Sequence, residues 1–457
     1  VSGSLAHVVQ DGTPQLGGNL DLNSNSITGT GNLDIANGTI KLDGNYPTGT
    51  NNVALGDTAL SSGSLSGASN TAIGHAALIA NTSGNVNTGI GKQALTANTT
   101  GSNNVALGGQ ALDANTTASF NTAIGYNSLT SNLIGANNTA LGYQSLCKNT
   151  ASNNTAVGYN ALVANTTGTN NVAIGKDSMD SSTTGSANTA VGVDSMQSNT
   201  IGHSNVAVGY NSLWTNSEGF DNTAVGIEAL VSNTTGDCNT AIGSDALATN
   251  STASNNTAVG SSSLRANTTG HSNVAVGKDS LKLNTEGNNN VAVGIGSLES
   301  NTTGTNNTAH GTYALRCNTT ADSNTALGYT SLYANTTGTE NVAVGATALC
   351  ANTDGDNNTA VGFNALVANT TGANNTALGL CANSTSTDRS DNTAIGYLSL
   401  KVNTATGNTA VGAYSGDSNI GGAAITAIGN RALCSNTTGN NGTAVGLCSL
   451  RSNTTAS

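Results

Sequence analysis

The stretch GYNALVANTTGTNNVAI, from Gly158 to Ile174, decides the fold. Close variants of it recur about two dozen times between Asn52 and Ser457. The glycine that ends each copy occurs 24 times, and of the 23 intervals between successive glycines twenty span 17 residues, one spans 18 and two span 16. A period this short and regular is typical of a solenoid, in which each repeat forms one coil stacked on the previous one.

The end of each copy predicts a β-strand. The position of Val172 holds Thr or Val in all 24 copies, and such β-branched residues favour extended backbone. The position of Ala173 holds Ala in 23 copies, with Gly89 as the exception. The position of Ile174 holds Val, Ile or Leu in 23 copies, with His310 as the exception.

Both faces of this strand are restricted in sequence. Neighbouring strand residues point to opposite faces, so a constant Ala beside a constant large aliphatic means that neither face is free to vary. We expect the column of Ile174 to face the coil interior and the column of Ala173 to pack against a neighbouring chain. The chains should therefore associate side by side.

A second apolar column follows each glycine. Four residues on, the position of Leu162 holds Leu or Met in 22 of 24 copies, always preceded by Ala or Ser. This pattern predicts a second short strand. Together with the column of Ile174 it should form the interior, each fully buried side chain contributing roughly 1.5–3 kcal/mol.

The rest of the coil consists of turn-forming residues. Gly158 and Gly175 are expected to supply an unusual φ or a close backbone approach at the corner after the strand. Asn recurs in register in two further columns, those of Asn165 and Asn171. Stacked coils should join these side chains into amide ladders.

Composition excludes several classes of function. Only 8% of residues are charged and 3% aromatic, and the formal net charge is −12, with 12 Lys and Arg dispersed singly. No basic stripe exists to bind nucleic acid, and no run of about 18 apolar residues exists to insert into a membrane. Residues 1–48 alternate apolar and polar and predict a short β-rich connector, and the repeat shaft spans 49–457, where we expect the array to continue beyond Ser457.

The strand signature carries a resemblance to a known family. Asn-Thr-Ala-Val-Gly at 154–158 resembles the Asn-Ser-Val-Ala-Ile-Gly repeats in the heads of YadA-type trimeric autotransporter adhesins, which are trimeric parallel β-rolls. The segment DGTPQLGGNLDL at 11–22 resembles stretches of phage tail fibres that continue into such arrays. The expected fold is thus an all-β parallel β-solenoid or β-roll of about 24 coils, assembled as a homotrimeric fibre.

The resemblance also implies a function. We expect a structural shaft of a virion tail fibre that positions binding to a host cell-surface receptor or glycan. The alternative is a trimeric cell-surface adhesin or another extracellular filament. An ice-binding threonine face is a weaker alternative, because the Thr column switches to Val seven times.

Few residues suggest chemistry. Three copies of His310 around a trimer axis would be able to hold a metal ion or anion. The alternative is a tolerated, locally hydrogen-bonded substitution. Carboxylate pairs such as Asp177 with Asp180 are scattered along the shaft without a cleft, so we expect no enzyme activity and no cofactor.

Two further features are open in the sequence. Seven cysteines, an odd number, are expected to serve as small apolar fillers, although a bridge between Cys434 and Cys448 is possible. Repeats near 380–391 and 415–425 lack the Leu anchor. These two repeats are candidate sites for a bulge or ligand contact, and sequence drift is the simpler explanation.

Overall fold

The computed structural model describes residues 50–455. These residues form 24 three-residue strands joined by turns and bends, with no helix among them. The strands are β1 (Val53–Leu55), β2 (Thr71–Ile73), β3 (Thr88–Ile90), β4 (Val105–Leu107), β5 (Thr122–Ile124), β6 (Thr139–Leu141), β7 (Thr155–Val157), β8 (Val172–Ile174), β9 (Thr189–Val191), β10 (Val206–Val208), β11 (Thr223–Val225), β12 (Thr240–Ile242), β13 (Thr257–Val259), β14 (Val274–Val276), β15 (Val291–Val293), β16 (Thr308–His310), β17 (Thr325–Leu327), β18 (Val342–Val344), β19 (Thr359–Val361), β20 (Thr376–Leu378), β21 (Thr393–Ile395), β22 (Thr409–Val411), β23 (Thr426–Ile428) and β24 (Thr443–Val445).

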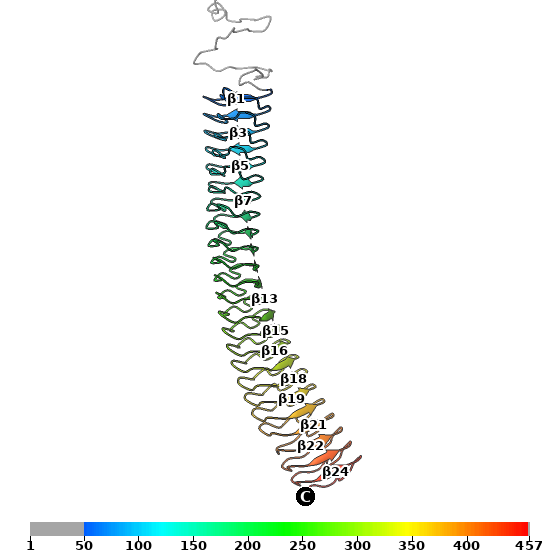
Figure 1. Ribbon diagram of the computed structural model, residues 1–457. Coiled ribbons are helices and arrows are strands. Elements are labelled where there is room, and N and C mark those ends of the chain that lie inside the picture. The colour runs from blue at the N-terminus through cyan, green and yellow to red at the C-terminus, as the bar shows by residue number, and fades with distance from the viewer. Residues whose placement is uncertain (1–49, 456–457) are drawn as a thin grey trace, which may run out of the picture. The chain divides into compact units, whose positions relative to one another are not determined.

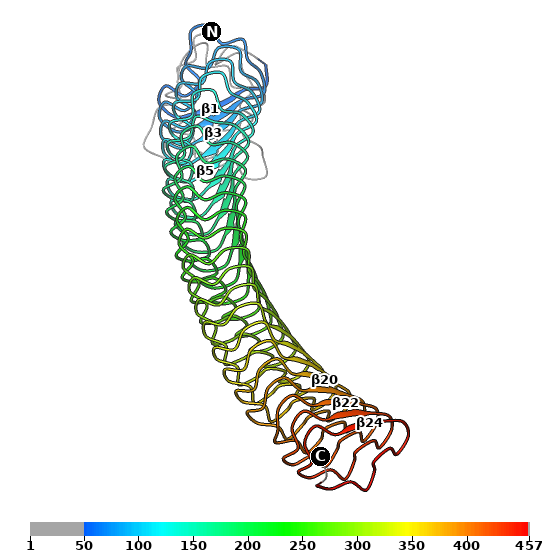
Figure 2. The same ribbon diagram turned by 60° about the horizontal axis from the view of Figure 1, so that its bottom comes forward.

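Each strand pairs in parallel with the strand of the next coil. The register is fixed along the whole stack, so that Thr155 of β7 lies opposite Val172 of β8, which in turn lies opposite Thr189 of β9. The strands form one continuous strip along one side of the stack (Figures 1 and 2). This confirms the predicted all-β parallel β-solenoid with a 17-residue repeat.

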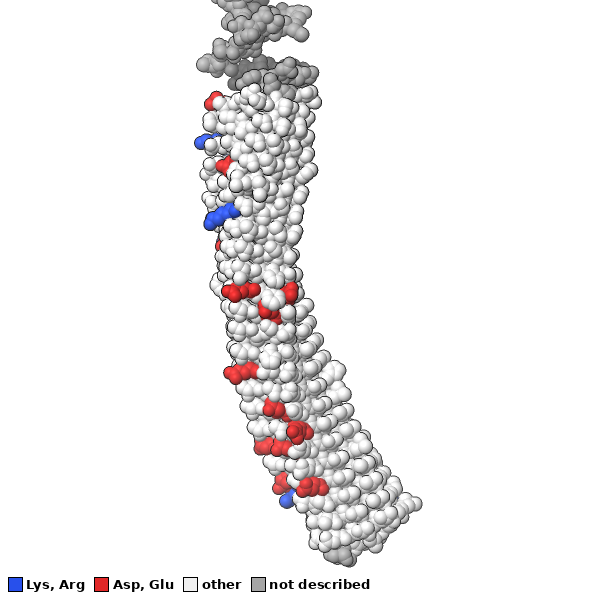
Figure 3. Space-filling view, in the orientation of Figure 1, with Lys and Arg blue, Asp and Glu red and all other residues white. Residues whose placement is uncertain are grey.

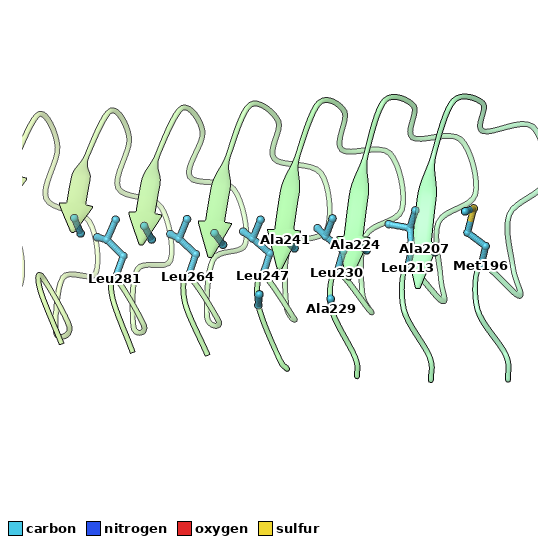
Figure 4. Close-up of a cluster of buried hydrophobic side chains, with 14 of the residues drawn as sticks. Met196, Ala207, Leu213, Ala224, Ala229, Leu230, Ala241, Leu247, Leu264 and Leu281 are labelled. Atoms are coloured by element: carbon cyan, nitrogen blue, oxygen red, sulfur yellow. The ribbon is translucent and has the colours of Figure 1, made fainter. Parts of the chain in front are cut away.

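The interior is built from the Ala and Leu columns. Ala173 and Leu162 have no exposed surface, and the same holds in nearly every coil. Figure 4 shows the side chains of Leu213, Leu230 and Leu247 pointing towards the strands that carry the core alanines. A small and a large side chain per coil therefore fill the narrow interior.

The predicted orientation of the strand was wrong for both columns, because the Ala column lies inside the coil instead of against a neighbouring chain and the aliphatic column lies outside. Ile174 is 39% exposed, and its column points out of the coil together with the column of Val172. The reason is the thinness of the coil: with a leucine already reaching across from the far side, only Ala fits beneath the strand. Strand alternation then sends both flanking side chains outwards.

The predicted second strand was also wrong. The residues around Leu162 form consecutive turns, and Leu162 itself has a left-handed φ of 54°. Its N–H still donates to the carbonyl of Ser178 in the next coil, at 2.9 Å. The inter-coil hydrogen bond is thus kept, while the left-handed backbone curls the chain back under the strand.

The corner glycine is required for two reasons, as predicted. Gly158 has a φ of 142° and Gly175 a φ of 140°, values that L-residues with a side chain rarely adopt. In addition, a Cβ on Gly158 would collide with the carbonyl oxygen of Gly175 in the next coil. The corner columns of successive coils therefore stack backbone on backbone.

Both asparagine columns are buried, and the first forms the predicted amide-to-amide ladder, whereas most hydrogen bonds of the second run between amide and backbone. Asn165 donates from Nδ2 to Oδ1 of Asn149 one coil earlier, at 2.6 Å. In the second ladder the backbone N–H of Asn171 donates to Oδ1 of Asn154 at 3.0 Å, and Asn171 Nδ2 donates to the carbonyl of Gly185 at 2.8 Å. The amides therefore satisfy the backbone of turns that no strand ladder reaches. The predicted connector at 1–48 lies outside the described residues.

Candidate interaction surfaces

The outer face of the sheet is a regular surface that runs along the described stack. It consists of two columns per strand, the Thr or Val column of Val172 and the aliphatic column of Ile174, and we call it the sheet face. Its aliphatic side chains are half-buried to exposed, for example Val208 at 36%, Ile242 at 41% and Leu378 at 46%. Uncharged threonine and aliphatic side chains thus face outwards along nearly the whole array.

The sheet face carries no Asp, Glu, Lys or Arg. None of its 48 positions, two in each of 24 strands, holds one of these residues. Figure 3 shows charged side chains, most of them acidic, spread over the left and central part of the stack in that view. An uncharged strip bordered by a charged flank is a feature of surfaces that become buried on association.

His310 lies on this sheet face. It follows Thr308 and Ala309 in β16 and its neighbours across the ladder are Val293 and Leu327. The expectation that it faces the coil interior was wrong, since its column points outwards and its side chain is exposed. Its use as a metal or anion ligand between copies stays a prediction.

Within residues 50–455, no three His, Cys, Asp or Glu side chains lie close enough together to hold a metal ion. Asp177 pairs with Lys176 at 2.9 Å, whereas burial raises the pKa of the nearby Asp180 carboxyl. No helix in the described part of the chain is long and apolar enough to cross a membrane.

The seven cysteines are free thiols. Six are half-buried and Cys238 is exposed, so the role of a small apolar filler fits the first six only in part. Cys434 and Cys448 do not form the bridge that their sequence positions left open. Burial raises the pKa of the thiols of Cys147, Cys317 and Cys350, which keeps them protonated and unreactive at neutral pH.

One cluster of aromatic and charged side chains was not predicted. Glu299 accepts a hydrogen bond from Nε of Arg316 at 2.7 Å, and Nη1 of Arg316 donates to the Tyr333 hydroxyl at 3.3 Å. The guanidinium carbon lies 4.8 Å from the ring centre of Tyr313 and 6.0 Å from that of Tyr333. Beside this cluster is a hollow of about 410 Å³.

The period of the repeat contains the signal that would have found this cluster. Glu299, Arg316, Tyr333 and Cys350 are spaced 17 residues apart, so each lies directly above the previous one in the stack. Columns on the surface whose residues vary are missed when only the constant columns of the strand and the core are compared. The same reading places the exposed rings of Tyr126, Tyr143 and Tyr159 in one column.

No protein-family model matches the chain, and no curated protein matches it in sequence.

Proposed function

We propose that the chain is the shaft of a non-enzymatic fibre in which three copies associate through their sheet faces. The observation that carries this proposal is the exposed, uncharged and in-register sheet face. Parallel sheets occur almost only with both faces covered, and in a single chain the coil covers just the Ala side. Another copy of the chain presents a sheet face with the same period and the same length, and is therefore the partner that matches this face.

The size of the face agrees with this role. At a strand spacing of about 4.8 Å, 24 strands extend for about 115 Å, and the two outward columns lie about 6.6 Å apart. The face therefore offers on the order of 800 Å², the area that each partner contributes to a standard interface. Val, Ile and Leu side chains in this area supply the hydrophobic stabilisation, and the absence of Asp, Glu, Lys and Arg avoids the cost of desolvating them.

We place this fibre on a virion tail, where the shaft holds a host-receptor or glycan-binding region away from the particle. The support is the resemblance of residues 11–22 to phage tail fibres and the length of the stack. The alternative is a cell-surface adhesin or an extracellular filament made from the same coil. Flanking coding sequence separates the two, since a baseplate-binding domain indicates a tail fibre and a secretion signal with a membrane anchor indicates an adhesin.

The association is tested by the native mass of the purified chain. Light scattering should give about three times 44.8 kDa. Introducing Lys on the sheet face through Ile242→Lys with Val276→Lys should lower this mass to that of a single chain, because it would bury unpaired charges. The matched control is Thr235→Lys with Thr269→Lys, which adds the same charge to exposed loops of the same two coils and should leave the mass unchanged.

A single-chain mass for the unmodified protein would refute the proposed association. If the unmodified chain is a monomer that depresses the freezing point of ice in a threonine-dependent way, the ice-binding alternative would replace the fibre. A trimer that survives both Lys substitutions would move the interface elsewhere on the coil.

A further inference from the structure

The hollow beside Arg316 is a candidate ligand site on the shaft itself. It is lined by Tyr313, Arg316, Tyr329, Thr330, Tyr333 and Cys350, from three successive coils. Its volume of about 410 Å³ falls in the range of small-molecule sites, and its lining of aromatic rings with a few polar groups is also typical of them.

The arginine in this hollow is held in a fixed position. Two rings flank its guanidinium, Glu299 engages Nε, and the Tyr333 hydroxyl engages Nη1. A guanidinium has five N–H donors, so three remain for a ligand in a geometry that is set in advance. The Arg316 side chain is 36% exposed, which leaves it reachable from solvent.

The aromatic residues offer ring faces as well as hydroxyls. Tyr329 is 58% exposed, the largest exposure of any tyrosine in the described residues. The stack of Tyr126, Tyr143 and Tyr159 differs, because these rings lie 5.8 and 5.3 Å apart and nearly parallel, and so cover each other's faces. Tyr329 is therefore the better platform for a flat ligand.

The charges of the cluster restrict the class of ligand. Glu299 compensates the charge of Arg316, so an anionic ligand would have to compete with a hydrogen bond of 2.7 Å. A cation would meet the guanidinium itself. Burial also raises the pKa of Cys350, so that this lining residue adds no negative charge. The ligand that fits is uncharged, with one apolar face and several hydroxyl groups.

We propose that Tyr313, Arg316, Tyr329 and Tyr333 form a binding site for a neutral saccharide on the side of the shaft. A pyranose ring stacks its C–H face on the ring of Tyr329. Its hydroxyl groups accept hydrogen bonds from Arg316, and both donate to and accept from the hydroxyl of Thr330. This site goes beyond the structural role proposed above. All of its residues belong to one chain, so it does not require association through the sheet face.

The test is binding of methyl glycosides of glucose, galactose, mannose and N-acetylglucosamine to the full chain. Saturation-transfer NMR identifies which of them binds, and calorimetric titration gives the affinity. At least one should bind saturably, and Tyr329→Ala should weaken it roughly tenfold or more, because the stacking platform is lost. Tyr329→Phe keeps the ring and should retain binding.

The matched control is Tyr159→Ala, which removes an exposed tyrosine from the same column ten coils away from Tyr329 and should not change binding. Failure of all four glycosides to bind refutes the site. So does unchanged affinity in Tyr329→Ala, or binding of N-acetylneuraminate or adenosine in preference to the neutral glycosides. The native mass, measured on the same samples, reports the fibre proposal separately.

Discussion

Two coils of the stack have neither leucine nor methionine at the core leucine position, and only one of them fills the space that is left. In the first, Asn383 occupies the leucine position, is fully buried, and finds no hydrogen-bond partner for its side-chain oxygen or nitrogen within the described residues. In the second, Gly416 occupies it, and Ile425 replaces a ladder asparagine and inserts into the core. A Cβ on Gly416 would lie 3.5 Å from Ile425 Cδ1 and 3.0 Å from Leu400 Cδ2.

The comparison separates what shapes the coil from what stabilises it. Both coils keep the backbone hydrogen bonds of the regular ones. The backbone N–H of Asn383 donates to the carbonyl of Ser399, and that of Gly416 donates to the carbonyl of Ala432, each at 2.9 Å. The backbone therefore tolerates loss of the leucine. The two coils should differ in stability instead. The buried, unpaired amide of Asn383 lowers the free energy of unfolding, whereas the apolar side chain of Ile425 has no such cost.

The largest change in stability is expected when a regular coil receives a buried asparagine at the leucine position, as in the Asn383 coil. Leu281→Asn removes a fully buried leucine and buries an amide without partners, so the local free energy of unfolding should fall by about 3–5 kcal/mol. Coils contact only their neighbours, so faster hydrogen exchange should be confined to β14, β15 and the adjoining turns.

Leu281→Met is the matched control, since Met179 and Met196 occupy the same column in the native chain. It should change stability by less than about 1.5 kcal/mol. Exchange rates that stay as slow in Leu281→Asn as in Leu281→Met would show that the column does not stabilise the stack.

The compensated coil is tested by a double-mutant cycle. Ile425→Asn alone restores the ladder residue but empties the core beside Gly416, and should destabilise this coil by about 2–3 kcal/mol. Gly416→Leu alone should overpack the core against Ile425 and cost about 1–3 kcal/mol. The double variant recreates a regular coil and should recover at least the native stability, measured by hydrogen exchange across β22 and β23. Additive effects of the two changes would contradict the compensation.

The uncompensated coil should gain from repair. Asn383→Leu replaces the unpaired amide with the residue found in 20 other coils at the same left-handed φ, which is 47° at Asn383 and 50° at Leu366. We expect stabilisation by about 2 kcal/mol or more, seen as slower exchange in β20 and β21. The control is Asn364→Leu, which changes a half-buried asparagine on the outer surface of the preceding coil. This substitution should not stabilise the stack. A loss of stability in Asn383→Leu would mean that the amide has a partner.

The sequence predicts the path of the coil better than the direction of its side chains. The glycine period and the constant Asn columns identify the stack and both ladders, because glycine corners and amide ladders each require one residue type at one position. The column of Ile174 is equally constant, but constancy reports only that the position is constrained. It does not distinguish an interior from an exposed, charge-free face.

The candidate sites were predictable to different degrees. His310 stands out in the sequence as the exception in its column. Whether its side chain points into or out of the coil depends on the thickness of the interior, which the sequence does not show. The Arg316 cluster depends on three coils that differ from all others, so the consensus does not contain it. Its members are aligned by the 17-residue period alone, which becomes informative once successive coils are known to stack in register.

The smallest effect concerns a break in the first asparagine ladder. Ser182 replaces the Asn that would donate to Asn165, and both the Ser182 hydroxyl and Oδ1 of Asn165 are buried without a partner in the described structure. The side chain introduced by Ser182→Asn should donate to Asn165 and to the carbonyl of Gly185. Asn233, three coils further along the same column, donates in this way to Asn216 and Gly236, at 2.8 and 2.9 Å. The expected gain is about 1 kcal/mol, measured as slower exchange in β8 and β9.

The reverse change in an intact part of the ladder is the control for this last prediction. Asn233→Ser should cost a similar amount by orphaning Oδ1 of Asn216, which now accepts from Asn233. Equal and opposite effects at the two positions would mean that each ladder amide acts with its nearest neighbours only. If Asn233→Ser instead opened several coils in both directions, the ladder would be cooperative over a longer range, and the breaks at Ser182 and Ser386 would mark boundaries between independently stable segments of the shaft.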